Sequence, residues 1–347
     1  MSLVEPSATK SPPEPKPKER KRLHVRPRLG WVLVAAAAFA SVVVVNAFVV
    51  DNETSPGSAG SGQLIHLPGG ALHVDRSGPV MAPAIVLLPG LAESSAFWSR
   101  VVPVLSRHYD VYRVDLLGQG LSDKPGSGYG ITEQARAITA LIGKLGLCRP
   151  LLVGHSLGGV IAVAAAQAPT LMSGVVLLDV PPRADTMNLP IAAHLATWPG
   201  LGELLHQIEP DWLIRQQLAS ALAPEHPVPD SFVRDFNVMT YESFKHLEDE
   251  AVAFTGTRPL DQLAAREGIS PMVIFGREDR LVSVRGWSLW RHVAGSEFRI
   301  INGAGHDTAW EQPSEVSQLI AGFASQHDPH GCHGTGNPLL ARRHRRQ

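Results

Sequence analysis

Short apolar runs alternate with longer amphipathic stretches from about residue 64 to about residue 326. The runs have the length of buried strands, and the stretches between them repeat apolar residues at helical spacing. Strands are predicted at 64–67, 71–75, 84–88, 111–114, 151–153, 175–178, 272–275 and 298–301. Helices are predicted at 95–106, 132–145, 157–168, 284–293 and 312–324. This alternation predicts an α/β fold with a mostly parallel sheet covered by helices on both faces, and Pro68-Gly69-Gly70 predicts an opening hairpin.

The alternation stops between about residues 181 and 260. Helix-like pieces in this segment carry large apolar side chains, more than a polar surface connection would need. We interpret the segment as an insertion between two strands of the sheet.

An apolar segment precedes the α/β region. Residues 31–50 are apolar except Ser41 and Asn46, and about 20 such residues in a helix span the hydrocarbon core of a bilayer. We therefore predict one N-terminal transmembrane helix, a signal anchor over residues 29–50. The alternative is a signal peptide cleaved after Ala38-Phe39-Ala40, which would release a secreted protein.

The flanks of this segment predict its orientation. Residues 1–28 are rich in Lys, Arg and Pro, whereas the first basic residue after the span is Arg76. The positive-inside rule places the N-terminus in the cytoplasm and the α/β domain outside, at the cell membrane. Residues 1–28 are expected to be a disordered tail, 51–63 a linker, 64–326 the folded domain and 327–347 a second disordered tail.

Composition excludes several functions. The chain has 31 Lys and Arg against 32 Asp and Glu, so it lacks a global basic field that would hold nucleic acid. Two cysteines are too few for a disulfide framework to carry the fold. The His and Cys cluster at 327–333 lies in a polar tail without strand support, so no metal is expected. Neither a phosphate loop nor a dinucleotide fingerprint is present, and no cofactor is expected.

The strongest chemical signal is Gly154-His155-Ser156-Leu157-Gly158, which follows a predicted strand and precedes a predicted helix. A serine hydroxyl is a poor nucleophile unless a base takes its proton, and a sharp strand-to-helix turn holds its Oγ clear of the sheet. Glycines on either side leave room for that turn. Ser156 is therefore the predicted nucleophile, and the adjacent His155 is a tentative pocket residue.

An acid and a base are expected downstream in the order acid, then histidine. Asp279 follows the predicted strand 272–275 and can accept the Nδ1 proton of an imidazole. His306 follows the last strand on a loop able to reach the top of the sheet, which makes it the predicted base. Asp179, at the end of the preceding strand, and Glu278 are the alternatives to Asp279.

Acyl transfer also needs donors for the oxyanion. One comes from the residue after the nucleophile, Leu157, and one from the loop after the third strand, where Leu91 is expected. Both would act through their backbone N–H groups, so their apolar side chains are no obstacle.

Residues about 64 to 326 resemble the α/β-hydrolase superfamily, in the esterase- or lipase-like branch with a helical cap between the sixth and seventh strands. The resemblance rests on the turn at Ser156, residues 115–123 after the fourth strand, residues 276–279, and Gly305-His306 followed by Glu311 and Pro313. It implies structural roles for Asp115, Gly118, Gly120 and Ser122. The sequence departs from the family where Pro89-Gly90 replaces the usual His-Gly.

The insertion at about 181–260 is then expected to fold over Ser156 as the cap. Its tentative pocket residues are Trp198, Trp212, Phe232 and Phe236. Together these features predict a membrane-anchored serine hydrolase that acts on small ester-type or lipid-like substrates. The alternatives are an aminopeptidase or C–C bond hydrolase with the same triad, or a sensor of this fold that binds a small molecule with slow or no turnover.

Overall fold

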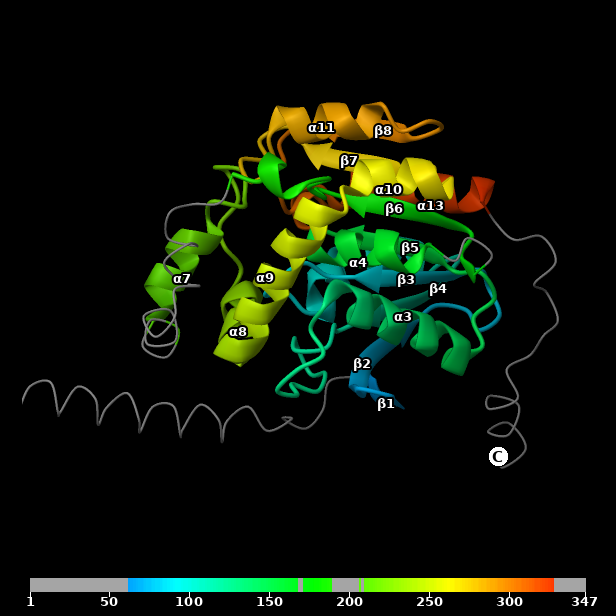
Figure 1. The fold of residues 1–347 in the computed structure, drawn as a ribbon, viewed down its shortest axis with the longest axis horizontal. Coiled ribbons are helices and arrows are strands. Elements are labelled where there is room, and N and C mark those ends of the chain that lie inside the picture. Colours follow the sequence, from blue (N-terminus) through cyan, green and yellow to red (C-terminus); the bar gives the residue numbers. More distant parts are fainter. Residues whose placement is uncertain (1–61, 168–170, 189–205, 207–208, 328–347) are drawn as a thin grey trace, which may run out of the picture. The chain divides into compact units, whose positions relative to one another are not determined.

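The computed structural model describes residues 62–167, 171–188, 206 and 209–327. Within them lies an eight-stranded sheet of order β1-β2-β4-β3-β5-β6-β7-β8 (Figure 1). The strands are β1 (Gln63–Leu67), β2 (Gly70–Ser77), β3 (Ala84–Leu88), β4 (Asp110–Val114), β5 (Leu151–His155), β6 (Gly174–Leu178), β7 (Met272–Gly276) and β8 (Glu297–Ile301). β1 and β2 form the predicted hairpin, β2 is antiparallel to β4, and the other pairs are parallel. The predicted α/β fold class is confirmed.

Alternate residues of the central strands supply two apolar cores, one on each face of the sheet. In β3, Val86 and Leu88 pack into one core, whereas Ile85 and Leu87 pack into the other. β5, β6 and β7 divide their side chains in the same way. Because successive side chains of a strand point to opposite faces, a strand covered on both faces must be apolar at nearly every position. This requirement explains the uninterrupted apolar runs in the sequence.

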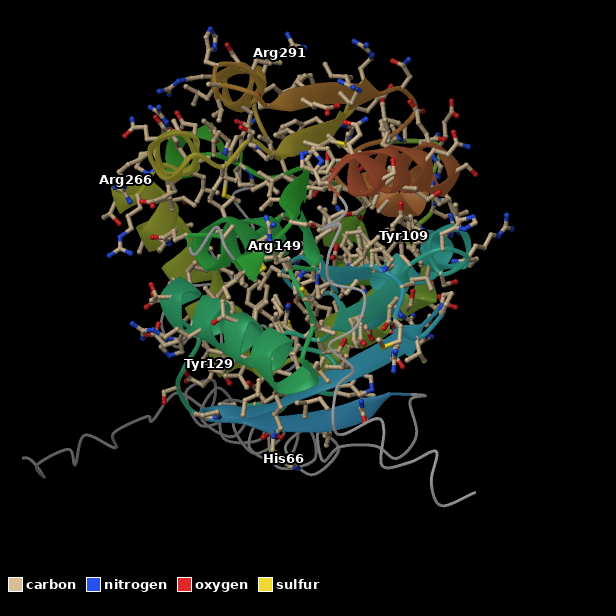
Figure 2. All side chains as sticks on the ribbon, turned by 90° about the vertical axis from the view of Figure 1, so that its right-hand side faces the viewer. His66, Tyr109, Tyr129, Arg149, Arg266 and Arg291 are labelled. Atoms are coloured by element: carbon tan, nitrogen blue, oxygen red, sulfur yellow. The ribbon has the colours of Figure 1, made fainter. Side chains whose placement is uncertain are left out.

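The helices form a layer on each face. One core receives buried side chains from α3 (Ile131–Leu145), α4 (Leu157–Ala165), α10 (Leu260–Glu267) and α11 (Val284–Arg291). The other receives them from η1 (Ser95–Arg100), α2 (Val102–Leu105), α12 (Thr308–Glu311) and α13 (Pro313–Gln326). Figure 2 shows the layers on opposite sides of the sheet, with Tyr129 and Arg266 on one side and Tyr109 on the other.

One predicted helix differs in form. The stretch 95–106 is a 3-10 helix, η1, followed by the separate four-residue helix α2. Pro103 stands in the first turn of α2. Proline lacks a backbone N–H and is tolerated in a first turn but not inside a continuous helix, which explains the break.

The insertion between β6 and β7 is helical where the structure describes it. It contains η3 (Ala184–Thr186), α7 (Asp211–Leu218), α8 (Asp230–Val238), α9 (Tyr241–Thr257) and then α10. α7, α8 and α9 lie together beyond one end of the strands (Figure 1). The side chain of Thr240 accepts a hydrogen bond from the backbone N–H of Ser243 at 3.2 Å and so caps the N-terminus of α9.

The turn after β4 is held by one buried carboxylate. Asp115 accepts hydrogen bonds from the backbone N–H groups of Ser95 at 2.5 Å and Leu121 at 2.8 Å, and from Nδ1 of His73 at 3.0 Å. Burial alone would raise the pKa of Asp115, but its hydrogen bonds to His73 and to backbone N–H groups lower that pKa overall. Asp115 thus joins β2, η1 and the turn at residues 115–123.

The predicted transmembrane helix at residues 29–50 lies outside the described residues. Among the residues that are described, no helix has both the length and the apolar character needed to cross a bilayer.

Candidate active site

Ser156 occupies a sharp turn between β5 and α4. Its backbone lies in the left-handed region, with φ of 45° and ψ of −115°, which is unusual for a residue other than glycine. A Cβ at Gly154 would come within 2.4 Å of the Gly158 carbonyl oxygen, and a Cβ at Gly158 within 2.4 Å of the Leu88 carbonyl oxygen. Glycine at both positions therefore lets strand, helix and neighbouring loop approach closely enough to hold this turn.

His306 and Asp279 form a buried pair at the same edge of the sheet. The imidazole Nδ1 lies 3.1 Å from Oδ2 of Asp279, and their side chains are 7% and 0% exposed. The backbone N–H groups of Leu281 and Val282 donate to Oδ1 of Asp279, at 2.8 and 3.1 Å. Burial lowers the pKa of His306, but the charge and hydrogen bond of Asp279 outweigh it and raise that pKa above its ordinary value of 6.5.

The two alternative acids have other partners. Oδ1 of Asp179 accepts a hydrogen bond from the backbone N–H of Gly276 at 2.9 Å, and Oδ2 accepts one from the hydroxyl of Thr308 at 2.6 Å. Glu278 accepts hydrogen bonds from backbone N–H groups in the loop before His306. Both carboxylates therefore fasten the loops around the imidazole, and Asp279 is the one bonded to its ring.

The two predicted oxyanion donors are both available. In the described part of the chain, neither the Leu91 nor the Leu157 backbone N–H donates a hydrogen bond to another residue. On either side of Leu91, Gly90 donates to Oε2 of Glu93 at 2.5 Å and Ala92 donates to Oε1 of Gln119 at 2.6 Å. Gln119 also donates to the Gly90 carbonyl oxygen at 3.0 Å. Glu93 and Gln119 thus brace the loop in which Pro89-Gly90 replaces the family's His-Gly.

His155 connects this loop to the loop of the base. Its Nδ1 donates to Oε2 of Glu93 at 3.0 Å and its Nε2 donates to the His306 carbonyl oxygen at 2.9 Å. Although the ring is fully buried, the negative charges of Glu93 and Asp307 raise the pKa of His155 to about 10. This pKa favours the imidazolium form at neutral pH, in which both ring nitrogens are donors.

Sequence analysis predicted His155 only as a tentative pocket residue and missed Glu93, Gln119 and Asp307. Among the described residues, Glu93, His155 and Asp307 each place a potential metal-ligand atom within 4.8 Å of the others. Both imidazole nitrogens are already hydrogen-bonded, so a metal would have to displace those bonds. That the site needs no metal stays a prediction.

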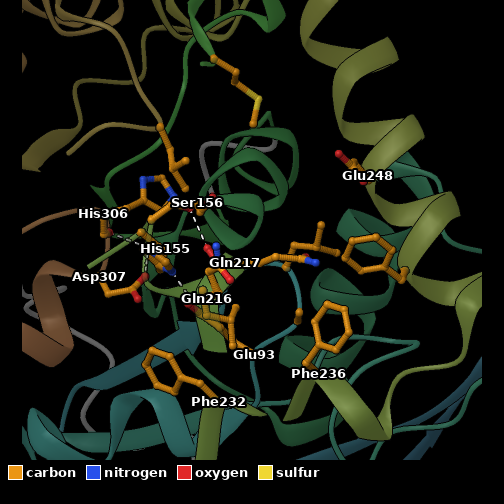
Figure 3. A pocket seen from close by; sticks show the side chains of 18 of the residues that line it. Glu93, His155, Ser156, Gln216, Gln217, Phe232, Phe236, Glu248, His306 and Asp307 are labelled. Carbon is orange, nitrogen blue, oxygen red and sulfur yellow. Dashed lines mark hydrogen bonds and ion pairs between the residues drawn. The ribbon is translucent and has the colours of Figure 1, made fainter. Parts of the chain in front are cut away.

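A cavity of about 420 Å³ opens at Ser156 and His306 (Figure 3). Its walls combine the edge of the sheet that carries Ser156 and His306 with helices of the insertion. The insertion contributes Leu213, Gln216, Gln217 and Leu218 from α7, Phe232 and Phe236 from α8, and Phe244 and Glu248 from α9. Most of the lining is apolar, and the predicted pocket residues His155, Phe232 and Phe236 belong to it.

The prediction for Trp212 is wrong. Its side chain is 66% exposed and does not line the cavity. α7 lines the cavity with Leu213, Gln216, Gln217 and Leu218, whereas the Trp212 side chain is directed towards solvent. Trp198 lies outside the described residues.

A family model described as the alpha/beta hydrolase family matches residues 85–319. The chain belongs to the α/β-hydrolase family. The matched region includes the turn at Ser156, the insertion, and the loops of Asp279 and His306.

Known proteins similar to this α/β-hydrolase include an uncharacterized protein of Mycobacterium tuberculosis. It is 28% identical over 264 residues, which cover 71% of this chain and 76% of the relative. The structure of an enol-lactonase from Burkholderia xenovorans LB400 matches with a TM-score of 0.65 and 22% identity, covering 76% of this chain and 100% of that one. The structure of a membrane phospholipase A, a bacterial virulence factor, matches with a TM-score of 0.64 and 20% identity, covering 87% and 98% of the respective chains.

Substitution of the two aspartates should separate their roles. Asp279→Asn should lower kcat roughly 10³-fold or more, because the ring would lose the carboxylate that orients it and stabilises imidazolium. Asp179→Asn should have a much smaller effect, since an amide oxygen can still accept from Gly276. Steady-state kinetics and a melting curve for each variant provide the measurement. A folded Asp179→Asn variant with the larger loss of kcat would contradict the assignment.

The activity of the hydrolase should depend on pH through His306. The imidazole must be neutral to accept a proton, and its pKa is raised above 6.5. The value of kcat/KM should therefore rise with pH and level off only above an apparent pKa higher than 6.5. A pH–rate profile between pH 5 and 9 measures this pKa, and a flat profile would argue against a histidine base.

Proposed function

We propose that the chain is a membrane-anchored serine hydrolase that cleaves ester-type and lipid-like substrates through an acyl-enzyme. The observation that carries the proposal is the convergence on one cavity of Ser156, in its left-handed turn, and His306, paired with Asp279. A nucleophile, a base and an acid in this relation are the requirements of acyl transfer by a serine.

The mechanism assigns one role to each group. Ser156 Oγ attacks the acyl carbonyl carbon while His306 takes the hydroxyl proton and Asp279 holds the ring. The Leu91 and Leu157 N–H groups donate to the oxyanion. His306 then gives the proton to the leaving alkoxide, which departs as an alcohol and leaves an acyl-enzyme. Water, deprotonated by His306, attacks the acyl-enzyme, and the acid is released as Ser156 regains its proton.

The apolar cavity supports an acyl chain as the bound group. Phe236 is buried, and its ring centroid lies 5.6 Å from that of Phe244, which also lines the cavity. Apolar surface that leaves water on binding contributes about 25 cal/mol per Å². An acetyl group is too short to cover most of this apolar wall. The similar structures include an enol-lactonase and a membrane phospholipase A, and cleavage of an ester bond by this chain agrees with both activities.

The rate should therefore rise with acyl chain length. For detergent-solubilised full-length protein and p-nitrophenyl esters from acetate to octanoate, each added methylene should raise kcat/KM by up to about fourfold, because it is worth about 0.8 kcal/mol. Phe236→Ala should flatten this dependence. Trp212→Ala is the matched control, since Trp212 is exposed and lies outside the cavity.

Two results would contradict this proposal. Values of kcat/KM that decline steadily from acetate upward would exclude the acyl-chain cavity. Hydrolysis by Ser156→Ala at the wild-type rate would exclude the nucleophile. Labelling of Ser156 by a fluorophosphonate without measurable steady-state turnover would instead favour the sensor.

The membrane anchor is a separate part of the proposal and rests on residues 29–50 alone. The basic flank before them and the absence of Lys and Arg from residue 51 to residue 75 favour a domain outside the cell. Protease added to intact cells should therefore degrade the hydrolase domain, whereas a cytoplasmic control protein stays intact. A soluble mature protein that begins at Ser41 and is recovered from the medium would show that the segment is a cleaved signal peptide.

A further inference from the structure

One carboxylate in the cavity wall has no role in the proposed chemistry. Glu248 lies on α9, four residues after Phe244, so the two side chains share a face of the helix, and both line the cavity. In Figure 3, Glu248 extends from α9 towards the cavity, on the other side of it from Ser156 and His306. It therefore stands at the end of the cavity remote from the nucleophile.

One oxygen of the Glu248 carboxyl group, Oε2, is buried without a hydrogen-bond partner in the described part of the chain. Lys245, on the same helix, pairs with Asp249 instead. Burial raises the pKa of Glu248 to about 7. The negative charge of Asp249 also raises this pKa, and the positive charge of Lys245 lowers it.

Several other polar groups that line the cavity are engaged in hydrogen bonds within the protein. Glu93 accepts from Gly90 and His155, Gln217 donates to Glu209, and the Ser220 hydroxyl donates to the Gln217 carbonyl oxygen. A buried oxygen without a partner destabilises a protein, whereas an apolar side chain at this place would continue the apolar wall. A glutamate there is best explained by a ligand that brings the missing donor.

We infer that Glu248 binds an uncharged hydrogen-bond donor, a hydroxyl group, at the distal end of the substrate's acyl chain. The inference rests on the proposed function, in which the acyl chain fills the cavity between Ser156 and Glu248. The favoured substrates are thus esters of hydroxylated acyl chains. A hydroxyl suits the site better than an ammonium group, because burying a cation in a largely apolar cavity carries a large desolvation cost.

The test compares matched pairs of esters. For each acyl length from four to ten carbons, kcat/KM of the ω-hydroxyacyl p-nitrophenyl ester is divided by that of the unsubstituted ester. For the wild-type protein this ratio should peak at one chain length. At that length it should be about tenfold higher than the same ratio for Glu248→Leu. Glu248→Gln keeps an oxygen acceptor and should retain most of the peak. Glu250→Leu, an exposed position on α9, is the matched control and should leave the ratio unchanged.

Three outcomes would overturn the inference. The ratio could be the same in wild type and Glu248→Leu at every length, in which case Glu248 recognises nothing on the chain. It could fall equally in Glu250→Leu, which would indicate a general effect of charge on α9. An ω-aminoacyl ester could exceed the ω-hydroxyacyl ester of equal length, and the ligand would then be a cation.

A binding measurement separates this inference from the proposed function. Calorimetry with Ser156→Ala compares ω-hydroxy and unsubstituted fatty acids at each length from four to ten carbons, with and without Glu248→Leu. If wild type hydrolyses no ester but the ω-hydroxy acid binds about tenfold more tightly only when Glu248 is present, the hydrolase proposal fails and the subsite stands. Equal binding of the two acids in both backgrounds would overturn the subsite.

Discussion

The reactive centre depends on how closely three backbone segments approach at Ser156. Gly158, in the first turn of α4, lies so near the loop after β3 that a Cβ there would be 2.4 Å from the Leu88 carbonyl oxygen and 2.5 Å from that of Pro89. The same contact sets the separation of the Leu91 and Leu157 N–H groups, because one belongs to that loop and the other to α4. In the proposed mechanism, the position of the nucleophile and the width of the oxyanion site therefore depend on one steric constraint.

This arrangement leaves several ionisable groups buried beside the cavity. Burial raises the pKa of Asp307 to about 7, and the nearby charge of Glu93 adds to the effect. His155 offsets these negative charges as an imidazolium, and its stacking on Phe97, with centroids 4.5 Å apart, keeps the ring between the two loops. As a buried cation, His155 compensates nearby negative charge, and its two charge-assisted hydrogen bonds also fix the orientation of the ring. His155 thereby couples the loop of the oxyanion donors to the carbonyl group of His306.

Much of the fold and the outline of the site could be predicted from the sequence, because both follow from local order along the chain. Buried parallel strands are continuous apolar runs, and their carboxyl ends meet at one edge, so residues that follow β5, β7 and β8 were expected together. The contacts of Glu93 with His155 and of Gln119 with Gly90 join residues 62 and 29 positions apart, and no spacing rule indicates such pairs. Trp212 was misplaced because aromatic content alone does not say which face of α7 the cavity takes.

The two aspartates illustrate how an environment divides similar groups between different tasks. Asp179 is fully buried at the end of β6, and its burial, together with the nearby negative charge of Asp279, raises its pKa well above 3.8. A raised pKa favours the protonated form, which can keep its hydrogen bonds with Gly276 and Thr308 without adding a second full charge beside the imidazole. Asp279 accepts two backbone N–H donors as well as the His306 ring, which suits a carboxylate. Each carboxyl group accepts three hydrogen bonds, but only Asp279 is bonded to the imidazole ring, so Asp279 is the one placed to orient that ring.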